Sequence, residues 1–155
     1  MEAYTDQSST ADVASQAAAT CCRYNDRAEL EVLLISSLDT GRWVIPKDNL
    51  NAKEQSFRCA EREAFEEAGI VGNAKKQPVG FYVYLKDRVR PTGVGVHLLR
   101  TRSTEQEFTE RGARQLTWVH PSIAAGMVAE PQLSQLFGTI AEASPNKRHS
   151  VRSVS

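Results

Sequence analysis

The chain has 155 residues, of which 41% are hydrophobic and 25% charged, an ordinary balance for one soluble globular domain. Nineteen Lys and Arg residues balance nineteen Asp and Glu residues, so no overall field favours nucleic acid or an anionic membrane. No apolar run approaches the roughly 20 residues that cross a bilayer, and the polar residues 1–15 lack the pattern of a signal peptide. A highly anionic ligand would therefore need a local basic site.

The two ends of the chain differ in composition from its middle. Residues 1–16 are rich in Ser, Thr, Ala, Asp and Gln, and residues 144–155 carry Pro, Asn, basic residues and four serines. Both compositions indicate disorder, which leaves one domain over residues 17–143. The basic run 147–149 could touch phosphate, but a solvated tail is the preferred interpretation.

Between these ends, strand and helix patterns alternate. A polar turn at 25–27 follows the first strand pattern, and a short extended piece at 43–45 ends at Pro46. Five segments are predicted strands: 17–24, 30–37, 79–85, 94–99 and 118–119. Three segments are predicted helices: 52–68, 121–128 and 131–143. Strands that flank a helix, with further helices at the end, predict an α/β layered domain.

Three cysteines at scattered positions fit neither a disulfide framework nor a zinc motif. Cys21 and Cys22 are adjacent, so they point to opposite faces if their segment is a strand. We expect packing roles for them and for Cys59, and a reducing, cytoplasmic location for the protein.

The helix at 52–68 has recognisable signals at both ends. Asn51 is a good N-cap, and Glu54 three residues later completes a capping box. Gly69 is the expected C-terminal stop, because glycine readily takes the left-handed conformation.

The same helix separates an apolar face from an acidic one. At 100° per residue the apolar stripe comprises Phe57, Ala60, Ala64 and Ala68. Glu63, Glu66 and Glu67 share an arc beside that stripe, and Arg62 can reach Glu66 four residues on. Glu61 projects close to the apolar stripe, which predicts incomplete burial there.

This acidic arc is unfavourable for helix stability by itself. Like charges four residues apart repel, and Glu66 and Glu67 stand near the negative end of the helix dipole. A hard divalent cation, Mg²⁺ or Mn²⁺, would relieve the repulsion and suits phosphate chemistry. From charge clustering alone, a solvated acidic face is the preferred alternative.

The spacing of these residues resembles the Nudix box, in which a Gly, five residues and a Glu precede seven residues and Arg-Glu-U-x-Glu-Glu-x-Gly-U, with U aliphatic. The residues in register here are Glu54, Arg62, Glu63, Glu66, Glu67, Gly69 and Ile70, with Ala64 a weak match to the first U. Asp48 occupies the position of the first Gly. Aspartate tolerates a left-handed backbone, but its charge could weaken phosphate binding or add a metal ligand.

The resemblance implies a fold, a reaction and roles for particular residues. The fold would be a Nudix-like α/β/α sandwich with a central mixed sheet. Glu63 and Glu67 would bind the metal, with Mg²⁺ the expected ion and Mn²⁺ an alternative. Glu66 would act as the base that activates water, and Arg62 and Glu54 would support the catalytic cluster. Segments 31–37, 42–46 and 118–119 are similar to the diphosphoinositol polyphosphate phosphohydrolase branch of the family.

Candidates for substrate contacts lie outside the helix. Ser36 and Ser37 could offer donors to phosphate or simply end a strand, and Lys47 could bind phosphate or be a plain surface lysine. Arg42 is a further candidate. A basic rim or a solvated connector could be formed by Arg23, Lys86, Arg88 and Arg90.

Several other side chains allow more than one interpretation. Core packing is preferred to base stacking for Tyr82 and Tyr84, and a structural role is preferred for His97. No partner is assigned to His120. An additional acid could come from Glu105, Glu107 or Glu110.

The leading hypothesis is Mg²⁺-dependent hydrolysis of a phosphoanhydride bond in a phosphorylated small molecule. The substrate would be a nucleoside diphosphate linked to another group, a dinucleoside polyphosphate or an inositol pyrophosphate. The alternative is a catalytically impaired Nudix-fold binding or regulatory module, for which Asp48 is the supporting feature. The oligomeric state is left open.

Overall fold

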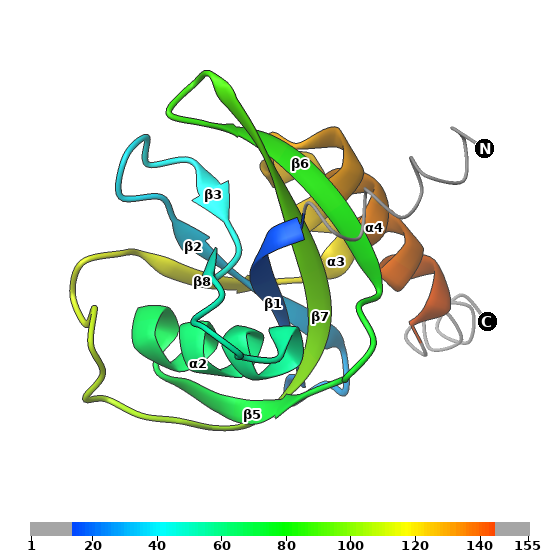
Figure 1. Ribbon diagram of the computed structural model, residues 1–155. Coiled ribbons are helices and arrows are strands. Elements are labelled where there is room, and N and C mark those ends of the chain that lie inside the picture. The colour runs from blue at the N-terminus through cyan, green and yellow to red at the C-terminus, as the bar shows by residue number, and fades with distance from the viewer. Residues whose placement is uncertain (1–13, 145–155) are drawn as a thin grey trace.

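The computed structural model describes residues 14–144 (Figure 1). Its strands are β1 (Ala14–Tyr24), β2 (Leu30–Ser36), β3 (Trp43–Val44), β4 (Lys47–Asn49), β5 (Ile70–Ala74), β6 (Gly80–Lys86), β7 (Arg90–Thr104) and β8 (Leu116–Val119). Its helices are α2 (Ser56–Ala68), α3 (Pro121–Met127) and α4 (Pro131–Ala143).

All eight strands join one mixed sheet in which the order β3-β2-β1-β7-β5 forms the main path. β4 also pairs with β1, β6 with β7, and β8 with β2. The central pair, β1 and β7, is parallel, and the other pairs are antiparallel. Alanines 17–19 of β1 are fully buried, as expected for a central strand that is covered on both faces.

Helix α2 lies on one side of the sheet, and α3 and α4 lie on the other (Figure 1). Each face has its own core. On one face the alanines of α2 pack against Leu33, Ile35 and Leu99. On the other, Phe137 of α4 packs among side chains that include Val96. The predicted α/β/α sandwich with a central mixed sheet is therefore confirmed.

The helix that carries the box begins later than predicted. Its N-cap is Gln55, whose side chain makes no capping hydrogen bond. Asn51 does receive half of the expected box, because its backbone N–H donates to Glu54 Oε1 at 2.9 Å. However, Lys53 has φ 65°, which breaks the helix and leaves 51–54 as a turn ahead of it. The C-terminal stop is confirmed at Gly69, with φ 70°.

Several strands are longer than predicted or absent from the prediction. β7 extends to Arg90 and Thr104 on either side of the predicted 94–99, since it pairs with β6 over its first half and β5 over its second. β4 and β5 were not predicted. Each is defined by pairing with a distant strand, and β4 is too short to show a period.

The predicted N-terminal boundary falls inside a strand, because β1 begins at Ala14. Residues 1–13 and 145–155, which hold the rest of the predicted disordered ends, lie outside the described residues. Cys21 and Cys22 pack on opposite faces of the sheet, as predicted. No helix within residues 14–144 is long and apolar enough to span a membrane.

Candidate functional site

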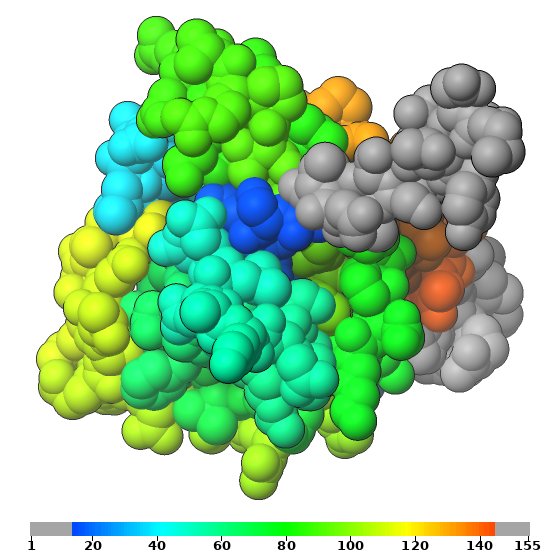
Figure 2. All heavy atoms as spheres, viewed as in Figure 1, coloured from blue at the N-terminus to red at the C-terminus, as the bar shows by residue number. Residues whose placement is uncertain are grey.

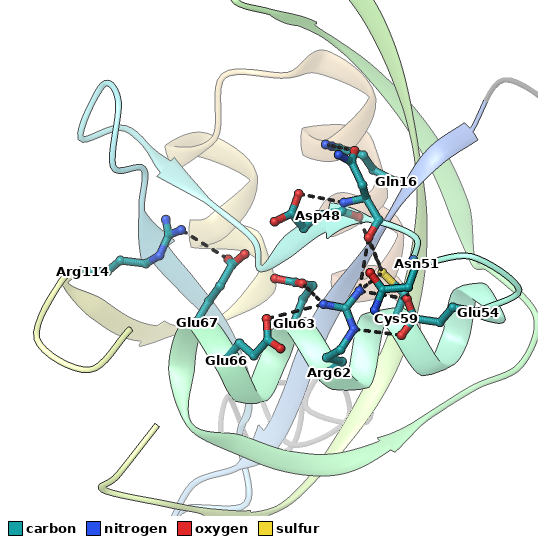
Figure 3. Close-up of polar contacts among 11 residues, drawn as sticks. Gln16, Asp48, Asn51, Glu54, Cys59, Arg62, Glu63, Glu66, Glu67 and Arg114 are labelled. Atoms are coloured by element: carbon teal, nitrogen blue, oxygen red, sulfur yellow. Dashed lines mark hydrogen bonds and ion pairs between the residues drawn. The ribbon is translucent and has the colours of Figure 1, made fainter. Parts of the chain in front are cut away.

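Arg62 on α2 is the centre of a polar network that includes Glu54, Glu63 and Glu66 (Figure 3). Its Nε and Nη2 donate to the two carboxylate oxygens of Glu54 at 2.9 and 2.8 Å. Nη1 donates to Glu63 at 2.6 Å and lies 3.5 Å from Glu66, and Nη2 also donates to the carbonyl of Asn49 at 3.2 Å. Arg62 thereby fixes β4, the turn before α2 and two helix carboxylates relative to one another.

Three carboxylates converge beside this network (Figure 3). Glu63 and Glu67 lie one turn apart on α2, and Asp48 comes from β4. One oxygen of each lies within 4.8 Å of the other two. Glu63 and Glu67 are 2% and 4% exposed, whereas Asp48 is exposed to solvent. β4 reaches the helix because it pairs with β1, with Asp48 opposite Ala17.

Burial dominates the protonation of this cluster. It raises the pKa of Glu67 to about 9, and a side-chain hydrogen bond with Glu63 adds to that rise while Arg114 opposes it. Burial also raises the pKa of Glu63, and the negative charge of Asp48 contributes in the same direction. Without a cation, the Glu63–Glu67 pair therefore retains a proton at neutral pH.

A hard divalent cation fits this donor set. Clustered carboxylate oxygens are the ligands that Mg²⁺ and Mn²⁺ prefer, and a cation would displace the retained proton. The residues that would hold it are Glu63 and Glu67, and the Asp48 carboxylate lies within 4.8 Å of both. A metal site also needs neighbouring groups that orient its ligands, and Arg62 does this for Glu63.

Glu66 differs from its buried neighbours in its access to solvent. Its side chain keeps 36% of its surface exposed and is held only by the 3.5 Å contact to Arg62 among the described ion pairs. Water can therefore reach a carboxylate that stands next to the buried cluster in sequence and in space (Figure 3).

Segment 105–115 packs against the C-terminal end of α2 and brings Glu110 and Arg114 to the carboxylate cluster. The backbone N–H of Glu110 donates to the carbonyl of Glu66 at 2.9 Å. Arg114 donates to the Glu110 carboxylate at 2.8 Å, lies 3.7 Å from Glu67, and donates to the carbonyl of Ser36 at 3.0 Å. Of the three candidate loop acids, Glu110 is thus the one tied to the cluster.

The two serines predicted to contact substrate have structural partners. Ser36 Oγ accepts from the backbone N–H of Gln115 at 2.8 Å, and Ser37 Oγ accepts from that of Asp39 at 3.2 Å. The Ser37 N–H donates to the carbonyl of Arg42 at 2.7 Å. These contacts fit the alternative interpretation, in which the serines end β2 and shape the following turn.

Arg42 and Lys47 lie outside the carboxylate cluster. Arg42 is exposed and its Nε donates to Thr40 Oγ1 at 3.3 Å. Lys47 Nζ lies 4.2 Å from the centre of the Tyr84 ring. Within residues 14–144 no hydrogen bond or ion pair joins Ser37, Arg42 or Lys47 to the three carboxylates.

The candidate basic rim is divided between two ends of the sheet. Lys86, Arg88 and Arg90 form the tip of the β6–β7 hairpin, where Arg88 has φ 68°. Arg23 stands near the other end of β1 and pairs with Glu31 at 2.9 Å. These four residues do not make one rim.

The start of β1 lies between that hairpin and the segment that leads into α2 (Figure 2). A chain of hydrogen bonds crosses there: Tyr84 Oη donates to Gln16 at 3.0 Å, and Gln16 Nε2 donates to Asn49 at 3.0 Å. The neighbouring Tyr82 is 2% exposed and belongs to the core, as predicted.

Both histidines that the sequence singled out have structural partners. His97 is fully buried, with Nδ1 2.7 Å from the carbonyl of Lys75 and Nε2 2.9 Å from Ser56 Oγ. The structural role predicted for His97 is consistent with these bonds. His120 caps α3 by accepting from the N–H of Ser122 at 3.1 Å, a partner that the sequence analysis did not identify.

Sequence reasoning missed Arg114 and Gln16 altogether. Arg114 lies in a segment without periodicity, and its spacing of four residues from Glu110 was the one available signal. Gln16 fell within the segment predicted to be disordered.

Comparison with known proteins identifies the family to which this chain is similar. The family model described as the NUDIX domain matches residues 14–136. Diphosphoinositol polyphosphate phosphohydrolase 3-alpha of Mus musculus is 32% identical over 101 residues, 64% of this chain and 61% of that protein. The mitochondrial Nudix hydrolase 12 of Arabidopsis thaliana is 29% identical over 98 residues, 59% of this chain and 48% of that protein. The chain thus spans about three fifths of the first relative's length.

Solved structures agree on the fold. An Ap4A hydrolase of C. elegans in a binary complex superposes with a TM-score of 0.69 at 20% identity, covering 82% of this chain and 94% of that one. A Nudix hydrolase from Nitrosomonas europaea gives a TM-score of 0.64 at 17% identity, covering 83% and 88%. At these identities the likeness is one of fold.

Proposed function

The chain belongs to the Nudix family, and from that premise we propose that it is a divalent-metal-dependent hydrolase of a phosphoanhydride bond. The observation that carries the proposal is the convergence of Asp48, Glu63 and Glu67 beside the solvent-exposed Glu66. Mg²⁺ is the proposed ion, with Mn²⁺ able to replace it.

The proposed mechanism assigns different work to buried and exposed acids. A cation bound by Glu63 and Glu67 would neutralise charge on the diphosphate and lower the pKa of attacking water. Glu66, which water can reach, takes the proton from that water as the general base. Arg62 and Glu54 are positioning residues, because their paired bonds hold the helix carboxylates in place.

The proposed substrate is a small molecule with a diphosphate linkage. Relatives named diphosphoinositol polyphosphate phosphohydrolases support an inositol pyrophosphate, and the fold of an Ap4A hydrolase supports a dinucleoside polyphosphate. A nucleoside diphosphate linked to another group also contains a phosphoanhydride bond and is the third proposed substrate class. Ser36, Ser37, Arg42 and Lys47 are proposed to contact the substrate, and the support for Ser36 is that Arg114 donates to its carbonyl and lies 3.7 Å from Glu67. Three free thiols support the further proposal of a cytoplasmic location.

A turnover assay tests the reaction. Hydrolysis of diadenosine polyphosphates, nucleoside diphosphate sugars and inositol pyrophosphates would be measured with and without Mg²⁺. We expect metal-dependent cleavage of one class, and a loss of about 10²- to 10⁴-fold in kcat for Glu66→Gln, since the base is removed. Glu107→Gln is the matched control, because Glu107 is 87% exposed and pairs with Arg111.

The alternative is a Nudix-fold binding or regulatory module, favoured by Asp48 at the glycine position of the box. That function predicts no turnover across the panel while metal and a phosphorylated ligand still bind. Equal rates for Glu66→Gln and the unaltered protein would argue against Glu66 as the base.

A further inference from the structure

Asp48 replaces a glycine of the box with a carboxylate that faces the helix acids. We propose that Asp48 is a third protein ligand of the divalent cation, which lets this chain bind the cation before a phosphorylated substrate arrives. The inference rests on the proposed function, because it concerns the cation of that same site.

The backbone holds Asp48 in a position that does not require glycine. β4 is extended and pairs with β1, with Asp48 opposite Ala17. Cys59 Sγ lies 3.6 Å from the carbonyl oxygens of Asp48 and Asn49, and Arg62 donates to the second of these. These contacts attach β4 to α2, so the backbone of Asp48 is held in place relative to the helix.

The side chain has capacity for a cation. Its Oδ1 accepts the backbone N–H of Asn49 at 2.8 Å. A carboxylate offers about four lone-pair sites, so this hydrogen bond, the one that residues 14–144 make to the Asp48 carboxylate, leaves room for a metal ion. The ligand oxygens of Asp48, Glu63 and Glu67 all lie within 4.8 Å of one another, a separation that one ion can bridge.

Three carboxylates change the order in which ligands bind. Mg²⁺ sites in phosphate chemistry usually have one or two carboxylates and complete the shell with water and substrate phosphates. Asp48 supplies a charge that a phosphate would otherwise bring, so the ion is held more tightly when no substrate is present. The same charge repels an incoming polyphosphate until the ion is bound.

Direct titration of Mn²⁺ tests this inference without measuring turnover. Binding to the whole chain would be measured by calorimetry, first without and then with imidodiphosphate, a diphosphate that resists hydrolysis. For Asp48→Asn and Asp48→Gly we expect the Kd for Mn²⁺ to rise by about tenfold or more without the diphosphate. The difference from the unaltered protein should shrink when imidodiphosphate is present, since phosphate oxygens replace the missing ligand.

Two further variants distinguish a failure of the role proposed for Asp48 from a failure of the proposed function. Asp26→Asn removes an equal charge in the turn after β1, far along the strand from Ala17, and should leave the Kd unchanged. Glu67→Gln removes an expected box ligand. Unchanged Mn²⁺ affinity in both Asp48 variants, with weaker binding in Glu67→Gln, would overturn the role of Asp48 and leave the proposed function standing. No Mn²⁺ binding by the unaltered protein would overturn both. Thermal unfolding without metal verifies that Asp48→Asn is folded.

Discussion

At the scale of single residues, the shape of the Arg62 guanidinium determines which carboxylates it can hold. Arg62 uses its planar fork to make two parallel bonds to Glu54 while a third nitrogen donates to Glu63. The bonds from Arg62 are the main cause that lowers the pKa of Glu54. A lysine has no planar fork, so it could not make the two parallel bonds to the Glu54 carboxylate while also donating to Glu63 and to a backbone carbonyl. The position of Glu63 therefore depends on the guanidinium.

We expect His97 to make the stability of the fold depend on pH. Burial lowers its pKa below the ordinary value of 6.5, although its bond to the carbonyl of Lys75 acts in the opposite direction. A lowered folded-state pKa means that stability is full above pH 6.5 and is lost as the pH falls towards the folded pKa. We expect a decrease of at most about 1.4 kcal/mol per pH unit from this one proton. Urea unfolding at pH 7.5 and 5.5 would measure it.

The matched variant for this prediction is His97→Asn. Its amide can still donate to the carbonyl of Lys75, but it cannot take up a proton in this range. The variant should be less stable at pH 7.5 and should lose less stability between the two pH values. An equal slope in the two proteins would assign the pH dependence to other groups.

At the scale of elements, the end of α2 organises the site. Gly69 ends the helix and sends the chain directly into β5. Its carbonyl accepts the N–H of Glu105 at 2.7 Å, and one turn earlier Glu66 accepts the N–H of Glu110. The segment that brings Arg114 to Glu67 is thus fastened to the last turn of the helix.

Gly69→Ala should destabilise the protein far more than Gly41→Ala. Both glycines have left-handed backbones, with φ 70° and 73°, so both substitutions cost about 1 kcal/mol in strain. A Cβ at Gly69 would also lie 2.6 Å from the carbonyl oxygen of Glu105 and 2.5 Å from the Phe108 ring, whereas Gly41 has nothing within 4 Å. We expect roughly 1–3 kcal/mol of additional loss at Gly69 from this overlap. Equilibrium unfolding of both variants checks it, and equal losses would contradict the packing argument.

At the scale of the whole molecule, the site joins parts of the chain that are distant in sequence. The parallel pairing of β1 with β7 builds the centre of the sheet. β4 pairs with β1 and contacts Cys59 and Arg62 of α2. The sheet therefore carries Asp48, α2 carries Glu63 and Glu67, and segment 105–115 carries Arg114. A ligand that bridges these parts should stabilise the entire fold.

Divalent metal should therefore raise the melting temperature of the protein. At a free concentration of 100 times the Kd, binding to the folded state adds about 2.7 kcal/mol. For a domain of this size that corresponds to about 5–10 °C in Tm. Differential scanning fluorimetry with Mn²⁺, and then with excess EDTA, would show the rise and its reversal. Glu67→Gln should lose most of the rise, and a similar rise in this variant would place the stabilising ion elsewhere.

The parts of the site that lie on one helix could be predicted from the amino-acid sequence. The spacing of Glu54, Arg62, Glu63, Glu66 and Glu67 identified the box, and helical periodicity alone separated the acidic arc from the buried alanines. Both depend on contacts within a few residues, which a local pattern records. The predicted start of the helix was wrong because the turn at 51–54, with Lys53 left-handed, carries capping residues without being helical.

The groups that join that helix from other elements became clear from the folded chain. Asp48 reaches it through the pairing of β4 with β1, and Glu110 was selected from three loop acids by its bonds to Glu66 and Arg114. The proposed basic rim was divided because Arg23 and the β6–β7 hairpin lie at different ends of the sheet. Strand pairing and loop closure join residues many positions apart, so no local period reports them. Asp48 and Arg114 therefore come to the helix acids through the fold as a whole.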